Sequence, residues 1–499
     1  MKKLRSAPRA LLLLVALTAS TGLVACGGTA AAPEWPPVAK KWFDRAEHSF
    51  KTGDLEDAKH AAENALLALP QEPAVRLVAA RIALAELEFD RAIELTNGLT
   101  GTEVAGIRGR AYWYKGDVEH AADELEVLAH DPELRDPWPK EVAHLARLGR
   151  GRRPFEMTGG IVAMTEMPRA GTTAMIVPLE INGEPSLALV ATDTAEAAID
   201  SKDGDGSWVS LRFGGRIEVS DVPAVGRDLS GIKRQVGAPI KLLIGVNLLR
   251  HLNATIDFSG AQFIVRNFEA PAPPEATTVH PIFYRGGALV LPTAFGVEAS
   301  APTATLLGHT TMTYPLALDD AGWTKAGQDP KQFVAVPGGG NLTYGTLRML
   351  RVGAFEVPNV PGVYGAPVAD LEKAIDVDLD GFAGSGLLAT FRLTFADRGR
   401  TLWIEDLPPE VIQARIDSQR RMAGDPTAPP LIAPTGPAPS GPAPGAPAAP
   451  TSPAPSTPAP SGSTAPQAPG AAPKSPAAPK SPGGTAPRGS APLPPGSAP

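Results

Sequence analysis

The chain has 499 residues, enough for about two or three domains, and its 43% hydrophobic and 20% charged residues are ordinary for a soluble globular protein. Its formal net charge is −7 and it has no long basic block, which argues against nucleic acid as a partner. Cys26 is the single cysteine, which excludes an internal disulfide and a cysteine-based metal site.

Residues 1–26 have the pattern of an export signal. A basic start precedes the short apolar run "ALLLLVALTA", and "LVAC" ends the segment. The run is shorter than the roughly 20 residues that a membrane-spanning helix needs. The pattern resembles the signal of bacterial lipoproteins, and this resemblance implies that Cys26 becomes the first mature residue and carries the lipid.

An ordinary secretory signal with a chance cysteine is the alternative to a lipidated Cys26. Lipidation is favoured because the lone cysteine stands where the lipoprotein signal requires one. Gly27 occupies the place where retention in an inner membrane often uses Asp. We therefore expect a lipid-anchored protein of the cell envelope, held to the membrane through Cys26 and, in a cell with two membranes, placed in the outer membrane facing the periplasm.

Residues 27–37 are expected to form a short linker, and helical spacing of apolar residues then fills residues 38–150. A period of 34 residues is visible, because Ala80 follows Ala46 and Ala92 follows Ala58 at this distance (80 − 46, 92 − 58). A third unit, "GRAYWYKGDVEHAADELEVL", arrives early, with a shortened loop.

The period and the placing of small residues resemble tetratricopeptide repeats. The positions that match their small residues, turn glycine and terminal proline are Ala46, Gly53, Ala58, Ala65 and Pro70. The resemblance implies closely packed helix pairs and a groove that binds a peptide or helix of a partner. A generic helical bundle is the alternative.

From about residue 155 the chain changes to short β-type runs with turns, and one segment occurs twice. "LIGVNLLRHLNATIDFSGAQFIV" (243–265) is echoed by "FAGSGLLATFRLTFADRGRTLWI" (382–404). The matched residues are 139 apart (384 − 245): Gly245 and Gly384, Leu248 and Leu387, Leu249 and Leu388, Thr255 and Thr394, Gly260 and Gly399.

The doubled segment, with an extended strand pair upstream of each copy (177–200 and 299–320), resembles retropepsin-like and pepsin-like aspartyl proteases. In that family an Asp-Thr-Gly loop in each lobe precedes a Gly-x-x-Leu-Leu segment. The resemblance implies an all-β bilobal domain, with lobe 1 at 158–270 and lobe 2 at 275–408.

Aspartyl proteolysis needs two carboxylates that share one proton. We align Asp193-Thr194-Ala195 of lobe 1 with His309-Thr310-Thr311 of lobe 2, 116 residues apart (309 − 193). Asp193 is then the candidate catalytic acid, and His309 occupies the position of the second. A hydrogen-bonded Asp193–His309 pair at a lobe interface is favoured over an unusual acid–base couple, because proteolysis uses the shared-proton dyad.

A competing view is that Asp319 or Asp320 supplies the second carboxylate. Both lie about ten residues beyond the loop, where a surface turn is the simpler interpretation. "DVDLDG" (376–381) matches half of a calcium loop, but Leu387 stands where a bidentate acid is needed. The eight histidines form no pair at ligand spacing on a helix. We expect no metal and no cofactor.

After lobe 2, residues 409–422 could form a closing helix. Residues 423–499 consist almost entirely of Pro, Ala, Ser and Gly, which cannot bury a core, so we expect a disordered tail with polyproline character.

The predicted fold is multidomain: an all-α helical repeat region, an all-β bilobal domain resembling aspartyl proteases, and the disordered tail. The function favoured is an envelope-tethered scaffold that binds a peptide or protein through the repeats and the interlobe cleft, with a degenerate, non-catalytic site. The alternative is an active aspartyl endopeptidase that uses Asp193 and an unidentified second acid. A third possibility is that the repeats recruit the partner and the β domain only supports them.

Overall fold

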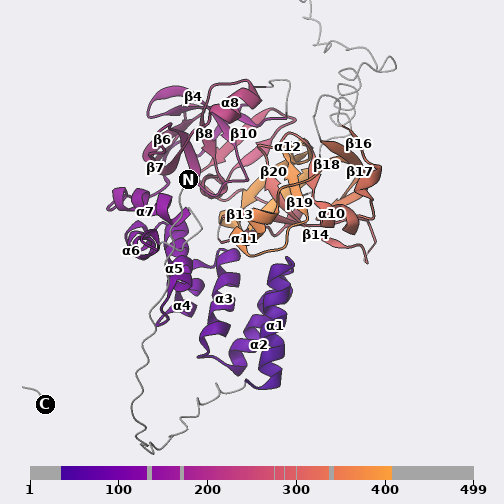
Figure 1. Ribbon diagram of the computed structural model, residues 1–499. Helices are drawn as coiled ribbons and strands as arrows, with labels where there is room; N and C mark the ends of the chain where they lie inside the picture. The colour runs from indigo at the N-terminus through magenta and orange to yellow at the C-terminus, as the bar shows by residue number, and fades with distance from the viewer. Residues whose placement is uncertain are drawn as a thin grey trace, which may run out of the picture. The chain divides into compact units, whose positions relative to one another are not determined.

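The computed structural model describes residues 35–131, 138–168, 173–274, 276–285, 287–298, 300–335 and 342–406 (Figure 1). The lipidation site at Cys26, the signal around it, most of the linker, the helix predicted for 409–422 and the tail predicted for 423–499 lie outside these residues. Within the described ranges, no helix combines the length and the apolar character that crossing a membrane requires.

The N-terminal region is helical, and its helices follow one another with short turns. They are α1 (Pro37–Lys51), α2 (Leu55–Ala68), α3 (Pro73–Ala85), α4 (Phe89–Thr96), α5 (Thr102–Lys115), α6 (Val118–Ala129) and α7 (Trp138–Leu148). Prolines begin α1 and α3, where a missing N–H costs no helical hydrogen bond. The side chains of Asp54 and Asp117 cap α2 and α6.

The small residues that mark the 34-residue period are buried between these helices. Ala46, Ala58, Ala80 and Ala92 are each no more than 1% exposed. Gly109 shows why size matters here, because a Cβ at this position would lie 2.6 Å from the side chain of Leu125 on the next helix. The helices therefore approach closely through small side chains.

Residues 156–266 form the first β lobe, called lobe 1 here. Its elements are β1 (Glu156–Gly159), β2 (Val162–Glu166), β3 (Ile176–Ile181), β4 (Glu184–Val190), β5 (Ala197–Asp200), β6 (Ser207–Phe213), β7 (Ile217–Arg227), α8 (Ser230–Val236), β8 (Ile240–Ile244), α9 (Val246–His251), β9 (Thr255–Asp257) and β10 (Gln262–Arg266). The turn Asn182-Gly183 joins β3 to β4 with positive φ at both residues, the conformation that this dipeptide favours in tight hairpins.

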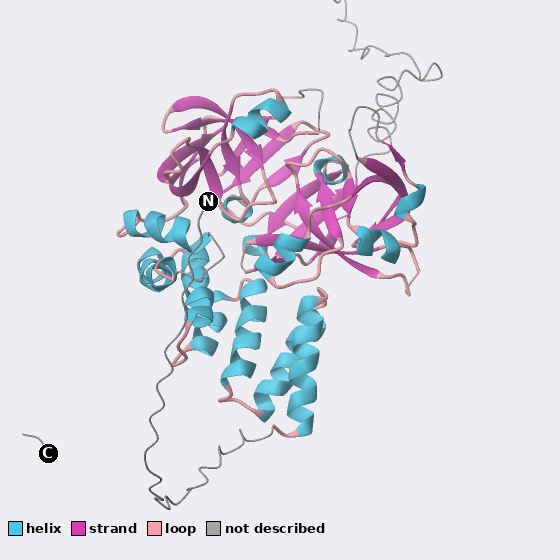
Figure 2. Cartoon of the chain, viewed as in Figure 1, coloured by secondary structure: helices cyan, strands magenta, loops and turns pink. Residues whose placement is uncertain are grey.

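Residues 277–406 form lobe 2. Its elements are β11 (Thr277–Val279), β12 (Ile282–Tyr284), β13 (Ala288–Ala294), β14 (Thr303–His309), β15 (Leu316–Leu318), α10 (Asp320–Lys325), η1 (Pro330–Gln332), β16 (Val334–Ala335), β17 (Thr343–Val352), β18 (Phe355–Tyr364), α11 (Ala369–Ile375), β19 (Gly381–Gly384), α12 (Ser385–Leu388), β20 (Phe391–Ala396), η2 (Asp397–Gly399) and β21 (Thr401–Asp406). Figure 2 shows the strands of both lobes apart from the helical region.

Each lobe has its own sheet, and a third sheet joins them. In the described residues the sheets have the strand orders β1-β7-β5-β8-β4-β3-β6, β12-β13-β14-β19-β15-β18-β17-β16 and, for the joining sheet, β11-β21-β20-β9-β10-β2. One hydrophobic core runs through both lobes. The β region therefore consists of two lobes built on a common middle layer.

The repeat of 139 residues is a structural repeat. A shift of 139 residues aligns α8 with α11, the start of α9 with the start of α12, and β10 with β21. At the centre of the joining sheet β9 pairs with β20, Thr255 opposite Thr394, and the two buried hydroxyls lie 2.8 Å apart. The doubled leucines are all buried, from Leu248 to Leu388. Equivalent segments of the two lobes thus meet at a shared axis.

Candidate functional site

Two threonines tie the lobes together at the ends of β4 and β14. The backbone N–H of Thr192 donates to Thr310 Oγ1 at 2.9 Å, and the backbone N–H of Thr310 donates to Thr192 Oγ1 at 3.2 Å. Thr310 Oγ1 also donates to the Val190 carbonyl at 2.8 Å. Both side chains are buried, at 2% and 1% exposed. This reciprocal pair makes Thr192 and Thr310 equivalent positions of the two lobes.

Two glycines give the same correspondence between the lobes independently. Gly245 and Gly384 are the residues just before α9 and α12, and neither tolerates a Cβ. At Gly245 a Cβ would lie 2.1 Å from the carbonyl oxygen of Glu196, and at Gly384 it would lie 2.0 Å from that of Tyr314. Glu196 and Tyr314 are 118 residues apart (314 − 196), the same separation as Thr192 and Thr310.

The alignment predicted from the sequence is therefore wrong by two residues. Asp193 was set opposite His309 at a separation of 116, whereas the structure matches Asp193 with Thr311 and His309 with Ala191 at 118. The tripeptide of lobe 1 that corresponds to His309-Thr310-Thr311 is Ala191-Thr192-Asp193. The error has a physical origin, because "ATDT" offers two threonines and only their tertiary contacts decide which one pairs across the lobes.

Asp193 and His309 nevertheless come close together. Thr311 Oγ1 donates to Asp193 Oδ2 at 3.0 Å and lies 3.1 Å from His309 Nδ1, while His309 Nδ1 lies 3.7 Å from Asp193 Oδ1. The side chains of Asp193 and His309 are 22% and 27% exposed. In the described part of the chain, Asp193 Oδ1 has no hydrogen-bond partner. The site thus groups one carboxylate, one imidazole and one hydroxyl, and the unpartnered oxygen of the carboxylate is itself buried.

This trio can hold a proton between an acid and a base, but its contacts offer no second carboxylate. Among the described residues, the side-chain partners of Asp193 are Thr311 and His309. A water held between two acids that share one proton, as aspartyl proteolysis requires, is not what these groups form. The arrangement suits hydrogen bonding and charge pairing with a ligand.

The rival acids have other roles. Asp319 caps α10 by accepting from the Gly322 N–H at 2.7 Å, and burial raises its pKa. Asp320 lies in the first turn of the same helix, where a negative charge is favourable. Both acids therefore serve α10, and neither is a partner of Asp193.

The three aspartates of "DVDLDG" contact different parts of the chain. Asp376 pairs with Arg81 at 3.0 Å, and Asp380 accepts from the Thr305 N–H at 2.8 Å and pairs with Lys325 at 2.5 Å. The backbone N–H of Asp378 donates to the Lys51 carbonyl at 2.9 Å. Within the residues that the structure covers, no group of three or more potential ligands is placed to hold a metal ion.

Glu196 is a charged residue whose role could not be inferred from the sequence. It is only 3% exposed, yet its carboxylate accepts from Trp113 Nε1 of α5 at 3.1 Å and from Trp138 Nε1 of α7 at 3.0 Å. Burial raises its pKa, and the indole hydrogen bonds oppose that rise. Trp208 of lobe 1 also donates to the Leu145 carbonyl of α7 at 2.9 Å. The hydrogen bonds of Glu196 and Trp208 therefore connect lobe 1 to α5 and α7.

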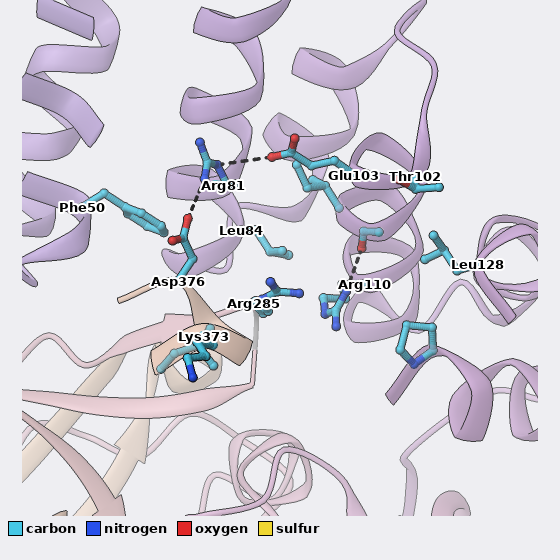
Figure 3. A pocket seen from close by; sticks show the side chains of 14 residues that line it. Phe50, Arg81, Leu84, Thr102, Glu103, Arg110, Leu128, Arg285, Lys373 and Asp376 are labelled. Atoms are coloured by element: carbon cyan, nitrogen blue, oxygen red, sulfur yellow. Dashed lines mark hydrogen bonds and ion pairs between the residues drawn. The ribbon is translucent and has the colours of Figure 1, made fainter. Parts of the chain in front are cut away.

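Lobe 2 contacts the helices as well and helps to form a cavity of about 340 Å³ (Figure 3). Side chains from α1, α3 and α5 form most of its wall, including Phe50, Arg81 and Ile107. Asp376 and Lys373 of lobe 2 close it, and Arg81 makes ion pairs with Asp376 and with Glu103 at 3.6 Å. One side of this cavity is thus formed by the chain's own β domain.

Comparisons with known proteins give distant structural neighbours. No protein-family model and no curated protein matches the chain. Solved structures similar to it include a retropepsin-like aspartic protease from Rickettsia conorii, at 18% identity and a TM-score of 0.19, covering 28% of this chain and 95% of that one. Basic 7S globulin from soybean has 10% identity and a TM-score of 0.33, with 50% and 95% covered.

Aspartic proteinase from Irpex lacteus is a further neighbour, at 12% identity and a TM-score of 0.32, covering 49% of this chain and 97% of that one. The structural neighbours thus include retropepsin-like and other aspartic proteases. TM-scores this low describe a distant likeness, which says nothing about the chemistry at Asp193 and His309.

Proposed function

We propose that this chain is a peptide- or protein-binding scaffold of the cell envelope whose aspartyl-protease-like domain does not cleave. One observation supports this most directly: the threonine pair sets Ala191 and His309 as the residues that precede Thr192 and Thr310. In the Asp-Thr-Gly pattern of the protease family the acid precedes the threonine. Both acid positions are then filled by residues without a carboxylate.

Asp193 belongs, in this proposal, to the third position of its tripeptide, where the family has glycine. A lone carboxylate beside a histidine cannot share a proton with a second acid, so the step that activates water is lost. The remaining groups can still recognise a ligand, since the side chains of Asp193 and His309 are partly exposed.

The helical region contributes a second binding surface in this proposal. Its buried alanines at a 34-residue period support the assignment as tetratricopeptide repeats. The cavity of about 340 Å³ among α1, α3 and α5 is large enough for a side chain of a bound peptide. Anchoring through a lipid on Cys26, and an outer-membrane position facing the periplasm, complete the proposal and place the binding surfaces near the envelope.

The test is to incubate the purified full chain with fluorescein-labelled unfolded casein at acid and at neutral pH, and to measure cleavage on gels and binding by fluorescence anisotropy. We expect anisotropy to rise with no cleavage at either pH, and Asp193→Asn to weaken binding because the charge is lost. Asp205→Asn, an exposed acid elsewhere in lobe 1, is the matched control and should bind like the parent chain.

The alternative function is an aspartyl endopeptidase that uses Asp193 with an unidentified acid. The unpartnered Oδ1 of Asp193 is the feature that favours it. Cleavage of casein that disappears in Asp193→Asn and persists in Asp205→Asn would establish the enzyme and refute the scaffold.

A further inference from the structure

A second cavity, of about 770 Å³, lies between the helical region and residues of both lobes, and it shares no lining residue with the Asp193 site. Its size is within the range of small-molecule sites. Both apolar and polar side chains line it. The lining residues are Leu87, Glu88, Phe89, Asp90, Arg91, Tyr114, Lys115, Met157, Arg250, His251, Asn253, Asn267, Arg398 and Arg400.

The charged lining of this cavity has an excess of cations. Five basic side chains face two acids, and most of the charges are already paired. The pairs are Lys115 with Asp90, Arg91 with Glu94, Glu88 with Lys59, and Arg400 with Asp397. Within the described residues, no ion pair is found for the guanidinium groups of Arg250 and Arg398. The surplus positive charge of the cavity therefore comes from these two residues.

Arg250 is the more unusual of the two. It is 4% exposed, and its Nη1 has no hydrogen-bond partner in the described part of the chain. Its Nε donates to the Arg398 carbonyl at 3.2 Å, and its guanidinium lies over the rings of Phe89 and Phe283. Burial lowers the pKa of Arg250 to about 10, although its interactions with Tyr114 and Glu196 raise it, so the group is still charged at neutral pH. A buried cation with an unmet donor costs stability unless something satisfies it.

Arg398 is held beside Arg250 by a strained turn. Asp397 and Arg398 have φ values of 48° and 55°, which side-chain-bearing residues seldom adopt, and Gly399 follows at 90°. A Cβ at Gly399 would lie 2.1 Å from Arg250 Cγ. The turn η2 therefore packs directly on Arg250, and the exposed Arg398 adds a second cation to the lining of the cavity.

His251 adds a neutral donor or acceptor to the same wall. Its ring stacks on Phe155 at 4.0 Å, and its Nε2 is buried without a hydrogen-bond partner in the described residues. Burial and the neighbouring arginines lower its pKa to about 3, so the ring is uncharged at neutral pH. A neutral imidazole can give one hydrogen bond to a ligand without adding charge.

We propose that this cavity binds an anion, a carboxylate or phosphate carried on an apolar body. The guanidinium groups of Arg250 and Arg398 hold the anionic head, since planar guanidinium donors match the oxygen pairs of both groups. His251 supplies a further hydrogen bond. Leu87, Phe89 and Met157 line the part of the cavity that receives the apolar body. This site is separate from the Asp193 site, and its failure would leave the scaffold proposal untouched.

The experiment is isothermal titration calorimetry of the purified full chain with benzoate, phenyl phosphate and, as the neutral analogue, phenol. We expect at least one of the two anions to bind and phenol not to bind measurably. Arg398→Gln removes the exposed member of the cation pair and should weaken anion binding about tenfold, because a hydrogen bond to a charged group contributes roughly 1.5 kcal/mol. Benzoate and phenyl phosphate distinguish a carboxylate ligand from a phosphate ligand.

Two further variants make the result decisive. Arg348→Gln removes an exposed arginine of β17 far along the chain from the cavity residues and should bind the anions like the parent. Arg250→Gln should abolish binding if the chain still folds; if it does not fold, Arg398→Gln alone decides. Absence of binding for both anions, or an equal loss in Arg398→Gln and Arg348→Gln, would overturn the proposal.

Discussion

The two lobes repeat one another closely in one part and poorly in another. In the segments that close the molecule, from Gly245 and from Gly384 onward, the helices, strands and buried leucines correspond at a constant separation of 139. In the loops at the lobe junction the separation is 118, and among residues 191–196 and 309–314 only the paired threonines are identical. The segments that join the two lobes therefore occur in both lobes. The junction loops do not repeat one another in this way.

The first way to test this comparison is to disturb the glycines common to both lobes. Gly245→Ala and Gly384→Ala each place a methyl group about 2 Å from a carbonyl oxygen of the backbone, which cannot rotate away. We expect each variant to lose about 3 kcal/mol or more of folding free energy. Chemical denaturation followed by circular dichroism measures the loss.

Gly231→Ala is the matched control for the two glycine variants. Gly231 lies in α8, and nothing lies within 4 Å of its added Cβ, so this variant should be neutral or slightly more stable. If Gly245→Ala and Gly384→Ala were as stable as Gly231→Ala, the two glycines would not lie as close to the backbone carbonyl oxygens as described.

The second test uses a position where the lobes differ. Glu196 of lobe 1 corresponds to Tyr314 of lobe 2, but only Glu196 accepts hydrogen bonds from the helical region. Glu196→Ala leaves two indole N–H groups unpaired, and we expect a loss of about 2–3 kcal/mol. Tyr314→Ala removes a side chain that is 38% exposed and should change the stability much less. Equal losses of stability in Glu196→Ala and Tyr314→Ala would contradict this difference between the lobes.

Glu196 should also make the stability depend on pH. Because burial raises its pKa above the ordinary 4.5, the folded chain binds this proton more tightly than the unfolded chain. The stability from this group therefore falls as the pH rises from 4.5 to the folded pKa, and is constant above it. Denaturation of Glu196→Gln over the same pH range should show a flatter slope than the parent chain.

The third and smallest stability effect concerns the threonine pair itself. Thr310→Val leaves the backbone N–H of Thr192 without its acceptor, and Thr192→Val does the same to Thr310. Each should lose about 1–2 kcal/mol in thermal or chemical denaturation. Thr311→Val is the control, since its hydroxyl contacts only side chains in the hydrogen bonds found here. A loss in Thr311→Val as large as in Thr310→Val would contradict the assigned register.

The β architecture could be predicted from the sequence because the patterns that indicate it are local and occur twice. The 139-residue echo located the segments that meet in the joining sheet, and the alanine period located the helices. The alignment of the two loops failed for a structural reason: lobe 2 has 21 more residues than lobe 1 between the junction loop and the shared segment (139 − 118). Thr192 and Thr194 are chemically alike, so only the fold could choose between them.

The candidate site was found only in part. Asp193 and His309 do lie together, but the hydroxyl of Thr311 between them was not foreseen. Glu196 was missed because its partners, Trp113 and Trp138, are about 80 and 60 residues away. The sole clue was an acid flanked by alanines in "AEAA" (195–198). Contacts between separate regions leave almost no signal in one sequence.

The indole contacts of Glu196 have a practical consequence for work on fragments. A gene truncated after residue 150 would produce helices whose two tryptophans have lost their acceptor, and a hydrophobic patch once covered by Trp208 would face the buffer. Such a fragment would tend to self-associate, and any protein it captured could be an artefact of that patch. Partner screens should use polypeptides that extend through lobe 1.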